Sequence, residues 1–266
     1  METETILTFL KTHITVTYTA AIITFTFTFA FLRKKQISFI EWNLGPPKQS
    51  GLLSLLAILA TFLLMTLLIS LGSEASDSST RKYAGIDALS QLIGLLIVSL
   101  PVLSIMKWQK EPLATAGISK LTIRISLILG FIIGIGELFI GTGVSWLGNL
   151  NMMYFWALMQ FVFVGFFEEF LFRGYLQTRL MRWLGTYKGW ILASLMMSLS
   201  HISIIYGWHG KSLSDAFLLS FETFPISLAL GYIYMKTGNI TGPAIIHTFM
   251  NFASAVNEIG QISSDI

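Results

Sequence analysis

The chain has 266 residues, of which 54% are hydrophobic and only 12% are charged, and its formal net charge is +3. Soluble domains carry about 25% charged residues, so this composition excludes a soluble globular protein. The chain has no cysteine, which excludes disulfides, thiolate metal sites and a cysteine nucleophile. We expect one integral membrane domain, 1–266, in the cell membrane, with membrane lipids as partners. Because no charge block or aromatic-interleaved basic stretch occurs, we expect no nucleic-acid partner.

Eight apolar segments approach the roughly 20 residues that a helix needs to cross a bilayer, which predicts an all-α polytopic membrane protein. Those of the N-terminal four-helix part, 1–146, are Ile14–Leu32, Gly51–Gly72, Ala88–Met106 and Ile125–Trp146. Those of the second part, 147–256, are Met152–Leu176, Trp190–Tyr206, Ala216–Tyr234 and Ile240–Val256. The Thr/Phe alternation at 24–29 would suit a strand in water, but an isolated strand in lipid leaves its backbone unpaired, which favours a helix.

The basic residues of the loops predict the orientation in the bilayer. The loops after the first, third, fifth and seventh segments hold twelve Lys and Arg residues, or thirteen with Arg173 of the fifth segment included, against three in the other loops. The positive-inside tendency places the richer loops in the cytoplasm and therefore both termini outside.

Three charged residues interrupt the fifth segment, where ionised groups are costly and usually mark a functional site or a buried ion pair. Glu169 and Arg173 are four residues apart, acid before base, which is the favourable order for an intrahelical ion pair. Glu168 is turned about 100° from Glu169 around the helix. We therefore expect Glu169 and Arg173 to support the helix, and Glu168 to stay free to meet His201.

Polar stripes on the sixth and eighth segments fall near the depth of the carboxylates. Ser194, Ser198 and His201 share one helical face, and so do Ala244, His247, Asn251 and Ser254. Gly165 lies on the face of Glu168 and would let another helix approach closely. These stripes predict a wet, conical intramembrane cavity that is enclosed by three helices and opens towards the cytoplasmic side.

Together these residues form three ordered motifs. They are Glu168-Glu169-x-x-x-Arg173, a following helix with His201, and His247-x-x-x-Asn251. Phe167–Tyr175 reads FEEFLFRGY and Gly238–Asn251 reads GNITGPAIIHTFMN. This pattern resembles the CAAX-protease and bacteriocin-processing family of intramembrane endopeptidases, also called Abi or CPBP proteins, over roughly Met152–Ser254. One departure is Met197, where the family's second motif normally has Phe four residues before the histidine.

The resemblance implies cleavage of a peptide bond within or near the membrane. Glu168 and His201 would share and deprotonate the attacking water, which is general-base catalysis. His247 and Asn251 would donate hydrogen bonds to the developing oxyanion. Similar proteins have been called metalloproteases, and Glu168, His201 and His247 form a possible zinc set. Because the chain has no HExxH motif and Asn is a poor zinc ligand, we favour a mechanism without a metal or other cofactor.

Other functions compatible with these residues remain open. A proton-coupled transporter also places carboxylates and histidines inside the membrane, although it would spread charge along a continuous path. A non-catalytic scaffold or a bacteriocin immunity protein on the same fold is the second alternative. The resemblance implies a peptide or a lipidated, membrane-associated protein as the substrate, with or without a prenyl group. Glu137 and Glu222 lie outside the motifs, and each suits a local hydrogen bond as well as a cavity wall.

Overall fold

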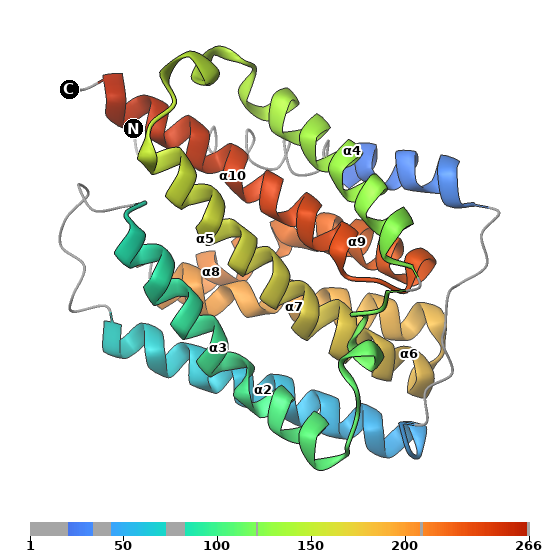
Figure 1. The fold of residues 1–266 in the computed structure, drawn as a ribbon. Coiled ribbons are helices and arrows are strands. Elements are labelled where there is room, and N and C mark those ends of the chain that lie inside the picture. Colours follow the sequence, from blue (N-terminus) through green and yellow to red (C-terminus); the bar gives the residue numbers. More distant parts are fainter. Residues whose placement is uncertain (1–20, 34–43, 73–82, 121, 208–209, 265–266) are drawn as a thin grey trace.

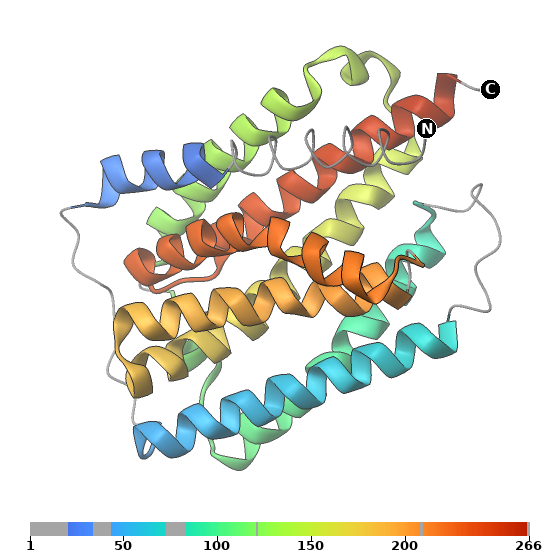
Figure 2. The same cartoon turned by 180° about the vertical axis from the view of Figure 1, so that it is seen from behind.

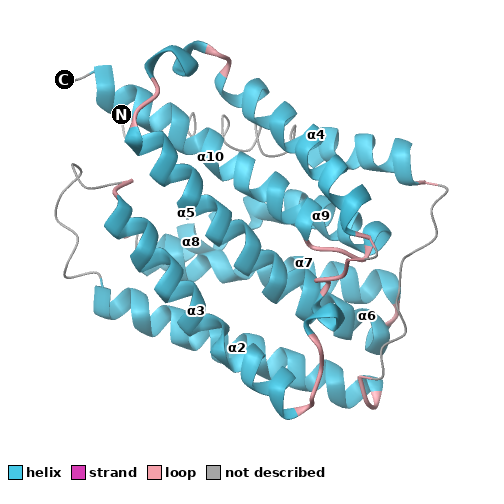
Figure 3. Ribbon diagram, in the orientation of Figure 1, coloured by secondary structure: helices cyan, strands magenta, loops and turns pink. Residues whose placement is uncertain are grey.

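The computed structural model describes residues 21–33, 44–72, 83–120, 122–207 and 210–264. Within these ranges the chain forms helices that are joined by loops, and it contains no strand (Figure 3). This confirms the predicted all-α fold. The helices lie side by side in one bundle, and most run between the same two ends (Figure 1).

The N-terminal part contributes a helix at Ala21–Leu32, then α2 (Pro47–Gly72), α3 (Gly85–Trp108), η2 (Leu113–Ala116), α4 (Ile123–Thr142) and η3 (Ser145–Asn149). The second part contributes α5 (Met152–Glu169), η4 (Phe170–Gln177), α6 (Thr178–Leu184), α7 (Thr186–Gly207), α8 (Leu213–Ser220), η5 (Phe221–Thr223), α9 (Phe224–Thr237) and α10 (Thr241–Ser264). The segment η4 is a π-helix, whereas η2, η3 and η5 are 3₁₀-helices.

Six stretches in the described part of the chain are long and apolar enough to cross a membrane. They are Pro47–Leu71, Gly85–Trp108, Ile123–Thr142, Met152–Leu184, Thr186–Gly207 and Leu213–Thr237. Of the predicted first segment, residues 14–20 lie outside the described residues, and Ala21–Leu32 is a shorter apolar helix. The predicted eighth segment is α10, which has 24 residues but carries several polar side chains.

The fifth span continues beyond its predicted end near Leu176, because α5, η4 and α6 form one continuous helical stretch to Leu184. The polar side chains after Leu176 look like a loop in the sequence, but they are buried and bonded. Gln177 Nε2 donates to Gly231 O at 2.9 Å, and Arg179 Nη1 donates to Tyr175 O at 2.9 Å. Tertiary partners therefore extend this helix past its apolar part.

The two ends of the bundle differ in charge. One end of the bundle contains the start of α2, the end of α3, the α6–α7 turn and the α9–α10 turn. The helix α10 finishes at the opposite end, as both views show (Figures 1 and 2). We call the first the basic end. It carries Lys48, Lys107, Lys110, Arg124, Arg182, Lys188 and Lys236.

The helix α10 packs against both α4 and α5. Glycines allow these contacts to be close. A Cβ atom added at Gly165 of α5 would lie 2.7 Å from both Ala244 O and Thr248 Oγ1 of α10. A Cβ at Gly134 of α4 would lie 2.7 Å from the ring of Phe249. The predicted close approach at Gly165 is thus confirmed, and α10 is the helix that approaches.

Candidate active site at the end of α5

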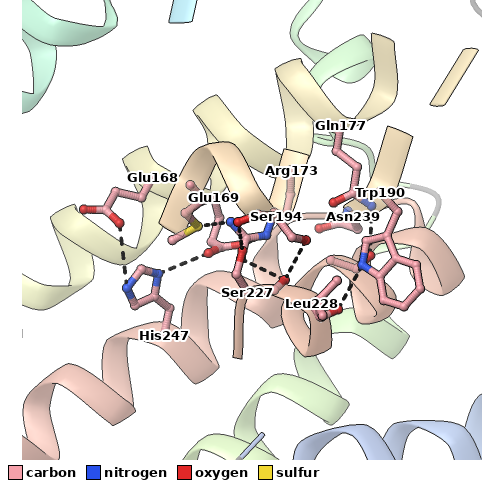
Figure 4. Close-up of polar contacts among 12 residues, drawn as sticks. Glu168, Glu169, Arg173, Gln177, Trp190, Ser194, Ser227, Leu228, Asn239 and His247 are labelled. Atoms are coloured by element: carbon pink, nitrogen blue, oxygen red, sulfur yellow. Dashed lines mark hydrogen bonds and ion pairs between the residues drawn. The ribbon is translucent and has the colours of Figure 1, made fainter. Parts of the chain in front are cut away.

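The two adjacent glutamates occupy the last turn of α5, where the α-helix passes into the π-helix η4. Glu169 is fully buried, whereas the side chain of Glu168 is 17% exposed. Consecutive helical positions point in different directions, and Figure 4 shows the two carboxylates approaching the His247 ring from different sides. π-Helical segments occur frequently at functional sites.

His247 of α10 lies between the two carboxylates (Figure 4). Its Nδ1 is 3.1 Å from Glu169 Oε1, and its Nε2 is 3.9 Å from Glu168 Oε2. The packing of α10 at Gly165 brings the ring to this position. Thr248 Oγ1, next to His247, also donates to Phe161 O of α5 at 3.1 Å. A carboxylate only accepts hydrogen bonds, so Nδ1 carries the proton in the contact with Glu169 and Nε2 faces Glu168.

Arg173 connects the buried carboxylate to two further helices. Its Nε is 3.2 Å from Glu169 Oε2, and its Nη2 donates to both the carbonyl and the hydroxyl oxygen of Ser227 in α9 at 3.2 Å. Its Nη1 contacts Met197 Sδ of α7. Ser194 and Ser227 hold α7 to α9 through reciprocal hydroxyl-to-carbonyl bonds of 3.3 and 3.0 Å. The ion pair therefore fixes Glu169 relative to α7 and α9.

The charges at this site balance when the imidazole is protonated. Two carboxylates then face one guanidinium and one imidazolium, and buried charges are tolerated only when they are paired in this way. Glu169 has two partners, but Glu168 Oε2 is buried and has no hydrogen-bond partner. At 3.9 Å its contact with His247 is too long for a direct hydrogen bond. Glu168 is thus the acceptor that remains available to a water or a substrate.

His201 of α7 and Asn251 of α10 make no hydrogen bond to Glu168, Glu169 or His247 among the described residues. His201 Nδ1 is 3.0 Å from Met197 O in its own helix, so its Nε2 is left as an acceptor when the ring is neutral. Asn251 follows His247 by one turn, and both His201 and Asn251 are partly buried. Among the described residues, no hydrogen bond or ion pair joins Glu168 to His201. The structure instead places His247 next to Glu168.

The possible zinc set does not converge here. Among the described residues, no group of three or more His, Asp or Glu side chains lies close enough together to hold a metal ion. Glu168 and His247 are neighbours, but His201 is not bonded to either. No step of the mechanism below is therefore routed through a metal.

The sequence does not indicate which residues hold Arg173. Ser227 and Met197 contact its guanidinium, yet serine and methionine in an apolar helix are ordinary packing residues. The sequence marks Met197 only as a departure from the family pattern. Outside the site, Glu137 accepts a hydrogen bond from Thr24 Oγ1 at 3.2 Å, so it has a local partner.

One family model matches part of the chain. Residues 150–253 match the family model described as type II CAAX prenyl endopeptidase Rce1-like. The matched segment begins just before α5, ends within α10 and contains all six motif residues. No curated protein and no solved structure matches this chain.

Proposed function

We propose that the protein is an intramembrane endopeptidase, because residues 150–253 match the family model described as type II CAAX prenyl endopeptidase Rce1-like. Its substrate is a peptide or a lipidated, membrane-associated protein, cleaved near the cytoplasmic face. The observation that carries the proposal is the cluster at the end of α5. There, His247 lies between a buried, paired carboxylate and a carboxylate with an open oxygen.

In the proposed reaction Glu168 is the general base. Its free oxygen takes a proton from a water molecule, and the water oxygen forms a bond to the scissile carbonyl carbon. The Glu168 carboxyl then returns the proton to the leaving amine as the C–N bond breaks. His201 Nε2 accepts a hydrogen bond from the other O–H of the water and orients it, and that hydrogen stays on the water oxygen. Atoms balance without a covalent enzyme intermediate.

His247 and Asn251 are proposed to stabilise the oxyanion. A protonated His247 has an Nε2–H donor beside Glu168, where the water would attack. Glu169 holds the other ring nitrogen at 3.1 Å and stabilises the imidazolium. Fixed donors aimed at a developing charge act strongly where water is excluded. Glu169 and Arg173 are positioning residues in this scheme.

The proposed orientation of the protein in the membrane follows from the basic end of the bundle. Lys and Arg residues near membrane ends favour the cytoplasmic side, so the basic end faces the cytoplasm and α10 finishes outside. A substrate would then reach Glu168 from the cytoplasmic leaflet.

Reconstitution into proteoliposomes tests the function. The probes are a fluorogenic peptide with a farnesylated C-terminal CAAX sequence and the same peptide without the prenyl group. We expect the wild-type protein to cleave at least one probe and Glu168→Gln and His201→Ala to lose about 100-fold or more of the rate. Cleavage that survives both substitutions contradicts the mechanism. Binding of a probe without cleavage by the wild type would favour the scaffold function instead.

A further inference from the structure

A pocket lined by both polar and apolar residues lies at the basic end, away from the glutamate site. Its volume is about 260 Å³, and its walls come from the start of α2 and the residues after α3, including Gly45, Gln49, Ser50, Gln109 and Glu111. Figures 1 and 2 both show these two segments side by side, near α6. We call this the α2–α3 pocket.

Buried polar atoms of the α2–α3 pocket have no partner in the described part of the chain. Ser50 is only 1% exposed, and its Oγ makes no hydrogen bond. The same holds for Gln109 Oε1 and for Glu111 Oε1, whose side chain is 4% exposed. Buried polar groups in proteins are nearly always hydrogen-bonded. Three such atoms around one cavity therefore indicate a polar occupant.

The pocket also has a positive edge. Arg182 Nη2 donates to Gly45 O at 3.4 Å, and its Nη1 is buried without a partner. Glu111 is paired through its other oxygen with Arg179, which offsets its charge. The first N–H groups of α2 point from the helix N-terminus, where anions are favoured. The pocket thus offers donors on the α2 side and acceptors at Gln109 and Glu111.

We propose that the α2–α3 pocket binds the headgroup of a membrane phospholipid. The phosphate contacts Ser50, Arg182 and the start of α2, while an ammonium or hydroxyl group of the headgroup donates to Gln109 and Glu111. The pocket lies between helices at the end where the loops begin, which is the depth of lipid headgroups. Basic side chains near membrane ends on the cytoplasmic side attract lipid headgroups, and Arg182 lies beside this pocket through its bond to Gly45 O. The cavity is also several times the roughly 30 Å³ that one water molecule occupies.

Lipid titration of the purified full chain, followed by native mass spectrometry, tests the site. The probes are phosphatidylethanolamine, phosphatidylglycerol, phosphatidic acid, diacylglycerol and inorganic phosphate. We expect the first two lipids to bind most tightly. Arg182→Gln should weaken both about tenfold, because it removes a charge-assisted contact with the phosphate. The control Arg124→Gln, an exposed arginine at the same end, should leave binding unchanged.

Gln109→Leu provides a second test that does not remove a charge. It should weaken phosphatidylethanolamine and phosphatidylglycerol but leave phosphatidic acid unchanged, since that headgroup has no ammonium or glycerol donor for Gln109. Melting temperatures of the variants check that each remains folded. Equal losses in Arg182→Gln and Arg124→Gln, equal binding of diacylglycerol, or saturation of the pocket by inorganic phosphate alone would overturn the proposal. Retention of phosphatidylethanolamine binding by both Arg182→Gln and Gln109→Leu would also overturn it.

Discussion

Replacing Arg173 by methionine tests the buried ion pair that holds the site. The substitution keeps an unbranched apolar stem but removes the contact with Glu169 Oε2 at 3.2 Å and two 3.2 Å bonds to Ser227. Both members of the pair are fully buried, so water cannot replace the lost partner. Glu169 then keeps only His247. Removing one partner of a buried pair costs about 3–5 kcal/mol, and we expect Arg173→Met to lose stability in that range.

Unfolding in mixed micelles, followed by tryptophan fluorescence, measures this loss. The matched double variant Glu169→Gln/Arg173→Met removes both charges. Its loss of unfolding free energy should be smaller than the sum of the two single losses by at least about 1 kcal/mol, because the effects of residues in contact are not additive. Arg33→Met, an exposed arginine at the end of the first described helix, is the control. A loss below about 1 kcal/mol for Arg173→Met, within the range of surface substitutions, would refute the ion-pair account.

Three further outcomes follow from the packing, the site and the charge distribution. Gly165→Ala should destabilise the protein by about 1–3 kcal/mol and slow cleavage, because the new Cβ would lie 2.7 Å from Ala244 O and push α10 away; Gly136→Ala, with no atom within 4 Å of its Cβ, should leave melting temperature and rate unchanged. Chelator treatment should leave the cleavage rate unchanged, and loss that is restored by added zinc would contradict the metal-free mechanism. Tags at both termini should be accessible to antibody from outside intact cells. A tag that becomes accessible only after permeabilisation would contradict the predicted orientation.

The fold class and the helical segments could be predicted because lipid leaves little choice. A long apolar segment in a bilayer must satisfy its own backbone, which favours a helix whatever its local propensity. The same reasoning missed the extent of the fifth span. Gln177 and Arg179 continue the helix only because Gly231, Tyr175 and Glu111 supply partners. Gly231 and Glu111 come from distant parts of the chain, so hydropathy alone does not indicate them.

The site was partly predictable for a similar reason. The spacing of Glu169 and Arg173 indicates an ion pair that forms within one helix, and the structure has it. The neighbour of Glu168 depends on how helices are rotated against one another, which depth and periodicity do not determine. The close packing of α10 at Gly165 accompanies a contact between His247 and Glu168 that the sequence does not indicate. The π-helix that follows Glu169 also has no signal in the sequence.

The catalytic role of Glu168 is tested most directly by comparing it with a second membrane carboxylate. Glu137 is buried in α4 and bonded to Thr24, and its amide variant can still accept that bond. In one proteoliposome assay with the same fluorogenic peptide, we expect Glu137→Gln to keep the wild-type kcat and Glu168→Gln to lose about 100-fold or more, with both variants melting like the wild type. Equal rates for the two folded variants would contradict Glu168 as the general base.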